Sequence, residues 1–204
     1  MNRALARCGG RLGLVLVILL GSACGSALPT RYVIEHDLGR FAYRRYQKTL
    51  DIEIAIEGNA AVGHTASYVR RDADMKVAVA TAFVTVYAHA ASLAAEARER
   101  LAALGNYQFS VRELAGKHVW LLDGGKAERW AIWISGPYLV KIGAPATEEL
   151  PEDLAHAYLS QYPSDLDEHG RARPGTGSAG PAKAATAEDR DLPLPASLRE
   201  GAPR

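Results

Sequence analysis

The segment Leu50-Asp51-Ile52-Glu53-Ile54-Ala55-Ile56-Glu57 carries the strongest β-strand pattern in the chain. Its apolar side chains stand at every second position, between acidic or small ones, and successive side chains of a strand point to opposite faces. Gly58-Asn59 follows as a turn signal. The pattern predicts a strand with one buried face and one acidic face that meets water.

Further strand patterns lie on both sides of this segment. Residues 76–88 are apolar on both faces, which is typical of a central strand. Shorter runs predict strands at residues 64–71, 107–114, 117–123, 127–135 and 138–143. The aromatic and basic stretch 41–46 is interpreted as strand surface, on which the two kinds of side chain pack together.

Two helical patterns interrupt the strands. Residues 93–104 place leucine and alanine on one face, with Ser92 as the expected N-cap and Gly105 as the stop signal. A second helix is expected to begin at Pro151 and to stop at Pro163. The sequence therefore predicts an α+β fold, an antiparallel sheet with two helices packed on one face.

Composition sets the limits of the folded domain. All aromatic residues lie between residues 31 and 166, so this range is expected to be a single α+β domain. Residues 167–204 hold five glycines, five prolines, eight alanines and no aromatic side chain. Such a segment cannot bury enough apolar surface to offset the entropy lost on ordering, so we expect a disordered C-terminal tail.

Residues 1–23 have the zones of a secretory signal peptide. Arg3, Arg7 and Arg11 give a positive start, and residues 12–20 are an unbroken apolar run. That run is about half of the roughly 20 residues that a membrane-spanning helix needs, so we expect it to be cleaved. The leader therefore predicts export from a bacterial cytoplasm.

The end of the leader, Gly21-Ser22-Ala23-Cys24, resembles the lipobox of bacterial lipoproteins, although that family usually has leucine where Gly21 stands. The resemblance implies that Cys24 becomes the new N-terminus and carries a diacylglyceryl group on its sulfur, with residues 24–30 as anchor and tether. Gly25, in place of the aspartate that retains many lipoproteins in the inner membrane, implies an outer-membrane protein that faces the periplasm. Ordinary cleavage after Ala23 is the alternative, and it would leave a soluble periplasmic protein.

Charge and cysteine content exclude several classes of function. The net charge of +1 becomes −2 without the three leader arginines, so no basic face for nucleic acid is expected. Cys8 and Cys24 are the two cysteines, so the mature domain has no thiol for metal binding or nucleophilic catalysis once Cys24 is lipidated. The six histidines stand singly. We therefore expect neither a metal nor a cofactor.

Catalytic motifs are absent, but carboxylates could in principle do acid and base chemistry. A pair of them needs one member in a desolvated site with a raised pKa, whereas acids that alternate with isoleucine are expected to face water. A hydrolase acting on cell-wall material is therefore the alternative to a non-enzymatic function. Its candidate acids are Asp51, Glu53 and Glu57, or Asp72 and Asp74.

A candidate binding surface follows from the hairpin predicted at Gly124-Gly125. If these two residues form the whole turn, Trp120 lies opposite Arg129, and Trp130 lies on the apolar core face. Tryptophan and arginine are enriched in interface hot spots, and aromatic rings can also receive sugars. The alternative is that a helix covers this face. The predicted binding residues are His118, Trp120, Arg129 and Trp133.

These features together predict a membrane-anchored lipoprotein of the cell envelope. The domain is expected to bind or assemble a partner without catalysis. Beyond the membrane that holds its anchor, the expected partner is an envelope protein or a cell-wall polymer.

Overall fold

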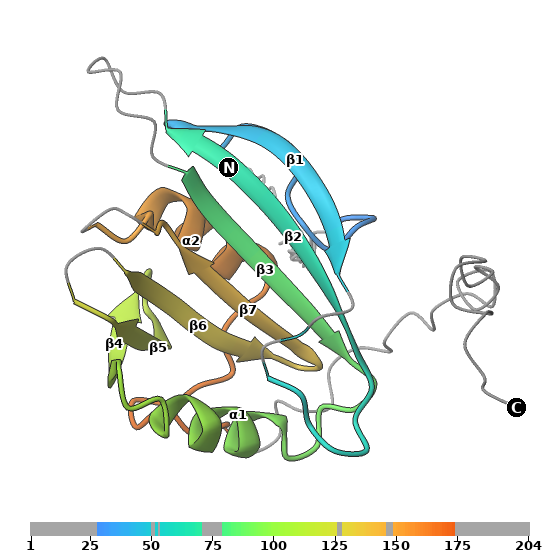
Figure 1. Cartoon of the computed structure of the whole chain (residues 1–204), viewed down its shortest axis with the longest axis vertical. Coiled ribbons are helices and arrows are strands. Elements are labelled where there is room, and N and C mark those ends of the chain that lie inside the picture. Colours follow the sequence, from blue (N-terminus) through green and yellow to red (C-terminus); the bar gives the residue numbers. More distant parts are fainter. Residues whose placement is uncertain are drawn as a thin grey trace, which may run out of the picture.

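The computed structural model describes residues 28–49, 52, 54–70, 79–125, 128–145 and 149–173. Within these residues, seven strands form one antiparallel sheet in the order β1-β2-β3-β7-β6-β5-β4, accompanied by two helices (Figure 1). The strands are β1 (Phe41–Thr49), β2 (Ala61–Arg70), β3 (Val79–Tyr87), β4 (Gln108–Leu114), β5 (Lys117–Asp123), β6 (Arg129–Ser135) and β7 (Tyr138–Gly143). The helices are α1 (Leu93–Ala102) and α2 (Glu152–Gln161). The predicted α+β class is confirmed.

Most of the predicted strands are present in the sheet. Strands β2 to β7 fall on the six runs predicted outside the opening segment, and β5 and β7 have the predicted bounds. Strand β1 includes the stretch 41–46 and forms one edge of the sheet. The turn between β4 and β5 is Ala115-Gly116, where both residues have positive φ, as the type I′ turn of a two-residue hairpin requires.

The segment with the strongest strand pattern is not a strand of the sheet in its described part. Residues 54–57 form a bend and a turn, with one isolated bridge at Ile56. The predicted alternation of burial holds here, since Ile54 and Ile56 are buried and Glu57 is exposed. The Tyr87 hydroxyl donates to the Ile54 carbonyl oxygen at 2.7 Å. This bond fastens the segment at one point, the end of β3, and the described part of the segment does not pair along a neighbouring strand.

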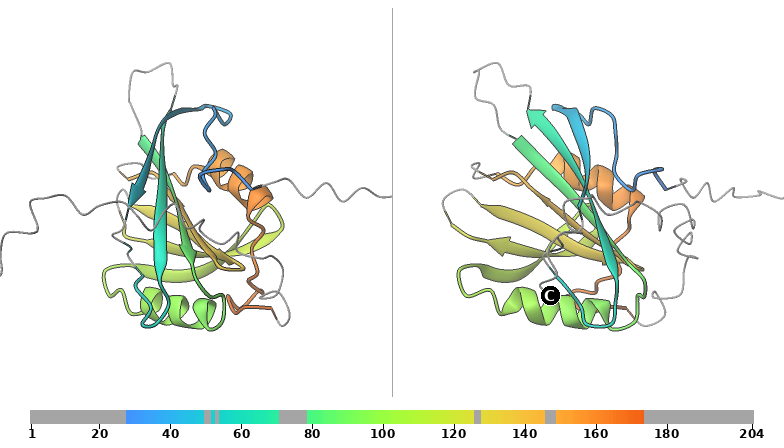
Figure 2. Two further views of the ribbon diagram at one scale, coloured as in Figure 1. Left: turned by 90° about the vertical axis from the view of Figure 1, so that its right-hand side faces the viewer. Right: turned by 45° about the vertical axis from the view of Figure 1, so that its right-hand side comes forward.

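Helix α2 covers one face of the sheet, as the left view of Figure 2 shows. Its buried residues include Leu154 and Tyr158, which face the strands. The Trp133 indole N–H on β6 donates to the Tyr162 carbonyl oxygen at 2.7 Å, and the Tyr158 hydroxyl lies 2.8 Å from that of Tyr68 on β2. We call the side of the sheet beneath α2 the covered face.

Helix α1 lies across the lower end of the sheet in Figure 1. Leu93, Ala97 and Leu101 are buried, at the spacing expected of an amphipathic helix. Ser92 is the N-cap residue, as predicted, but it has a φ of 63° and its side chain makes no capping bond. Its left-handed backbone differs from the β-region backbone that lets a capping side chain reach the first N–H groups.

The folded part extends past the boundary predicted at residue 166. The Trp120 indole N–H donates to the Gly170 carbonyl oxygen at 2.9 Å. A Cβ atom on Gly170, whose φ is 69°, would lie 2.7 Å from the indole nitrogen. Gly170 permits both the close approach of the Trp120 ring and the left-handed backbone, so it has a structural role. Composition alone counts such a glycine as a sign of disorder, and it therefore misplaced residues 167–173 in the tail. The leader, Cys24 and the remaining tail (174–204) lie outside the described residues.

Candidate functional site

The predicted tryptophan surface is divided between the two faces of the sheet. Gly124-Gly125 is not the whole turn, because the Gly124 N–H donates to the Glu128 carbonyl oxygen at 2.9 Å across a longer loop. Trp120 consequently pairs with Ile132 instead of Arg129. A shift by an odd number of residues exchanges the faces of one strand relative to the other. His118 therefore shares a face with Trp120, and Arg129 shares the opposite face with Trp133.

Burial also rules out an exposed platform made of these tryptophans. Trp120 and Trp133 are both 0% exposed, the first beneath Gly170 and the second beneath α2. Arg129 stays at the surface and donates to the Asp123 carboxylate at 2.8 Å. The prediction that the four residues form one binding surface is wrong, and the alternative of a covering helix describes Trp133.

The face of the sheet opposite α2 is accessible over part of β1, β2 and β3, whereas Thr85 and Tyr87, farther along β3 on the same face, are buried. Two rows of cross-strand pairs run over this face. In both rows the residues on β2 and β3 are half-exposed. One row is Arg45, Ser67, Thr81, Gly143 and Trp130, and the other is Gln47, Thr65, Phe83, Lys141 and Ile132. Their neighbours Ala66 and Ala82 on the covered face are 0% exposed. We call the accessible part the open face: Arg45, Gln47, Thr65, Ser67, Thr81 and Phe83.

An aromatic and cationic cluster borders the open face. The Lys141 ammonium lies 4.8 Å from the ring centre of Phe83 and 4.1 Å from that of Trp130. The Trp130 indole rests on the β7 backbone, since a Cβ atom on Gly143 would lie 2.2 Å from the ring. Its N–H donates to the Glu128 carboxylate at 3.0 Å, and this bond lowers the pKa of Glu128. The border is therefore fixed in place, with its cation held over two rings.

A hollow adjoins this cluster. Its cavity volume is about 50 Å³, and Lys141 is the charged residue in its lining. A hollow of this size has room for little more than a water molecule or one small apolar group. The lining residues are Thr49, Ile52, Ile54, Gly63, Phe83, Thr85, Ile132, Leu139 and Lys141.

The carboxylates considered for a hydrolase do not gather into a site in the part of the chain that the structure describes. Glu57 is exposed, and the other four candidate acids lie outside that part. No group of three or more metal-binding side chains occurs among the described residues. Burial raises the pKa of Asp165, but this carboxylate accepts the Gly136 N–H at 2.6 Å and closes the turn between β6 and β7, so its role is structural.

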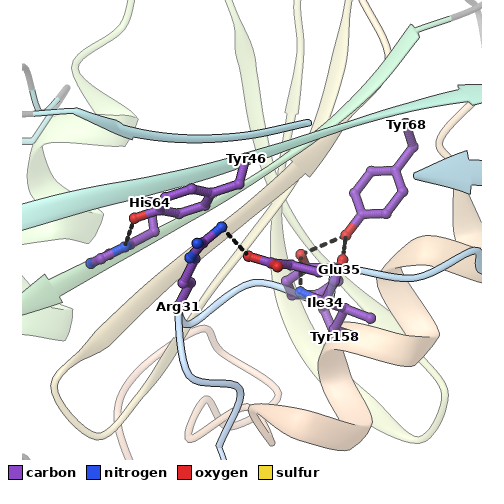
Figure 3. Close-up of polar contacts among 7 residues, drawn as sticks. All are labelled: Arg31, Ile34, Glu35, Tyr46, His64, Tyr68 and Tyr158. Carbon is purple, nitrogen blue, oxygen red and sulfur yellow. Dashed lines mark hydrogen bonds and ion pairs between the residues drawn. The ribbon is translucent and has the colours of Figure 1, made fainter. Parts of the chain in front are cut away.

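Tyrosine hydroxyls fasten the segment before β1 to the covered face (Figure 3). The Tyr68 hydroxyl donates to the Ile34 carbonyl oxygen, and the Tyr158 hydroxyl accepts the Ile34 N–H at 3.0 Å. The Tyr162 hydroxyl donates to the Tyr32 carbonyl oxygen at 2.7 Å. Burial raises the pKa of all three tyrosines, to about 12 for Tyr158, so their hydroxyls keep their protons to a higher pH than a solvent-exposed tyrosine does. We call these bonds the tyrosine clamp.

Sequence reasoning missed both the open face and the clamp. For the open face a signal was present, since Thr65 and Ser67 on one strand and Thr81 on the next place hydroxyls at alternate positions. The clamp had no local signal, because Tyr68 and Tyr158 lie far apart in sequence and meet only in the fold.

Comparisons with protein families, with curated proteins and with solved structures find no match for this chain. Among the described residues, the helices are too short or too polar to cross a bilayer.

Proposed function

We propose that the protein is a non-enzymatic binding module of the bacterial envelope, held by a lipid on Cys24 and facing the periplasm from the outer membrane. Its open face binds a protein partner or an envelope polymer such as cell wall. The observation that carries the proposal is the open face itself, where polar and aromatic side chains of three neighbouring strands are accessible side by side. Sites built on strands hold their side chains more firmly than sites on loops.

The chemistry of the open face suits recognition of a partner. Arg45 and Gln47 are exposed on β1 and offer charged and amide donors, while Thr65 and Ser67 add hydroxyls on the neighbouring strand. Phe83 supplies a half-exposed ring. Arginine and aromatic residues are enriched in protein interfaces, and rings with nearby hydrogen-bonding groups also suit sugars.

The anchor would orient this face usefully. The chain enters the domain on the covered side, because the clamp holds the backbone at Tyr32 and Ile34 against α2 and β2. The open face lies on the opposite side of the sheet from α2 (Figure 2). A domain tethered from its covered side therefore presents the open face away from the membrane, toward partners in the periplasm.

A matched pair of substitutions tests the open face. Ser67→Arg places a long charged side chain in the middle of it, and Ser160→Arg makes the same change on the exposed outer side of α2. Partner capture from detergent-solubilised envelopes, or co-sedimentation with cell-wall sacculi, should fall about 30-fold for Ser67→Arg, as when a hot-spot contact worth ~2 kcal/mol is lost. Ser160→Arg should bind like the wild type. Equal binding by both variants would contradict the proposal.

The anchor has its own test. Cys24→Ser should abolish the incorporation of labelled palmitate and release the protein from membranes or leave its precursor uncleaved. The wild-type protein should stay with membranes in high salt and leave them only in detergent. Release of the wild type by salt alone would show that it is not lipidated.

A further inference from the structure

A groove runs between the segment before β1 and helix α2. Its empty volume is about 1,240 Å³, counting the space open to solvent. Buried Val33 and Ile34 and half-buried Ala157 make an apolar floor, and Arg31 and Glu35 stand on its rim. The groove lies on the covered side of the domain, so it is separate from the open face.

We propose that this groove binds the headgroup of a zwitterionic phospholipid, with the phosphate on Arg31 and the ammonium on Glu35. The apolar floor receives the first carbons of the lipid tails. This inference rests on the anchor proposed at Cys24, because the anchor brings the groove to the bilayer. Binding there would fix the orientation of the domain and direct the open face away from the membrane.

The position of the groove favours a lipid occupant. Pro29, which lines one end of the groove, follows Cys24 by five residues. A chain spans at most about 3.6 Å per residue, so Pro29 lies within about 18 Å of the anchored sulfur. The clamp holds Ile34 against the domain, so the groove stays next to the point at which the chain enters the domain from the anchor.

The charges of the rim match a headgroup that carries both signs. Arg31 Nη1 lies 3.4 Å from Glu35 Oε1, and the two side chains are 58% and 36% exposed. Such an exposed pair contributes little stability by itself, so its members can exchange partners at low cost. An arginine fork also fits two phosphate oxygens. A purely anionic headgroup would meet Glu35 with like charge, and this favours the zwitterionic class.

Neighbouring rings hold the arginine at the rim (Figure 3). The Arg31 guanidinium carbon lies 5.0 Å from the ring centre of Tyr46, whose hydroxyl is 3.0 Å from His64 Nδ1. His64 also lies against Tyr32, with 4.7 Å between the ring centres. The cation is thus placed over a supported ring, which lowers the entropy that it loses when it binds a phosphate.

The test uses the full chain with Cys24→Ser, so that the result does not depend on lipidation. Amide NMR shifts are followed during titration with dihexanoylphosphatidylethanolamine below its critical micelle concentration. Saturating shifts should be confined to residues 29–38 and 157–161. Arg31→Gln should weaken binding about fivefold, which corresponds to a loss of about 1 kcal/mol. Arg129→Gln, which breaks a surface ion pair outside the groove, should leave the affinity unchanged.

Three results would overturn the inference. The first is the absence of saturable shifts in the groove, and the second is equal affinity for Arg31→Gln and the parent chain. The third is that inorganic phosphate produces the same shifts at the same concentrations, since this would identify a simple anion site. Palmitate labelling of the wild type reports the anchor separately, so failure of the groove and failure of the anchor remain distinguishable.

Discussion

Tyr158→Phe removes one hydroxyl from the tyrosine clamp and leaves the packing of the ring intact. The side chain is 0% exposed, so the phenylalanine ring can occupy the same space. The Ile34 N–H then loses its acceptor at 3.0 Å, and the Tyr68 hydroxyl loses its partner at 2.8 Å. Because an unsatisfied buried donor costs about 1–3 kcal/mol, the free energy of unfolding should fall by about 2 kcal/mol.

The bond between the Tyr68 and Tyr158 hydroxyls makes the effects of the two substitutions non-additive. Tyr68→Phe also breaks the bond between the two hydroxyls and removes the donor to the Ile34 carbonyl oxygen. Each single change thus counts the loss of the shared bond. The double variant Tyr68→Phe/Tyr158→Phe should therefore cost less than the sum of the two single changes, by about 0.5 kcal/mol or more.

Urea denaturation measures these costs, and hydrogen exchange at the Ile34 amide reports where they act. That amide should exchange faster in Tyr158→Phe, while amides in β3 keep their protection. Tyr43→Phe is the control, because its half-buried ring contacts Tyr68 but its hydroxyl takes no part in the clamp. An unchanged Ile34 exchange rate, or strict additivity, would refute the clamp as the fastening of this segment.

Three further predictions concern the sheet and its core. Trp133→Ala should cost about 3–5 kcal/mol in urea denaturation because its ring is enclosed beneath α2, and a cost close to zero would contradict the covered face. Gly143→Ala should cost about 1–3 kcal/mol or more, since its Cβ atom would overlap the Trp130 ring at 2.2 Å, whereas Gly105→Ala has nothing within 4 Å and should be close to neutral. Burial raises the pKa of Tyr158 from 10.0 to about 12, so above pH 10 the unfolded chain loses a proton that the folded chain keeps. The thermal midpoint should therefore fall as the pH rises from 10 to 12, and it should stay flat from pH 8 to 9.5.

Periodicity predicted the strands well because burial on one face imposes a local pattern. Strands β5 and β7 have the predicted bounds, and both predicted helices are present. Segment 54–57 departs from this rule. Its isoleucines are buried as the alternation requires, yet burial alone does not say whether a segment pairs along the sheet or is fastened at one point.

The candidate site depended on register, which the sequence pattern specified poorly. Trp130 and Trp133 point to opposite faces as alternation predicts, because they pair with Gly143 and Val140 on β7. The loop after Asp123, whose carboxylate accepts the Gly125 N–H and binds the Arg129 side chain, decided whether Trp120 and Trp133 share a face. Those bonds stabilise a loop longer than two residues, and two adjacent glycines do not reveal it.

Site-specific photo-cross-linking in intact cells tests the binding function most directly. A photoreactive side chain at Ser67, on the open face, is compared with the same side chain at Ser160, on the outer side of α2. The proposal predicts that light produces a discrete adduct, with a protein or with cell-wall material, from the Ser67 position and none of that kind from Ser160. An adduct formed equally from both positions, or from Ser160 alone, would contradict the proposal that the open face binds the partner.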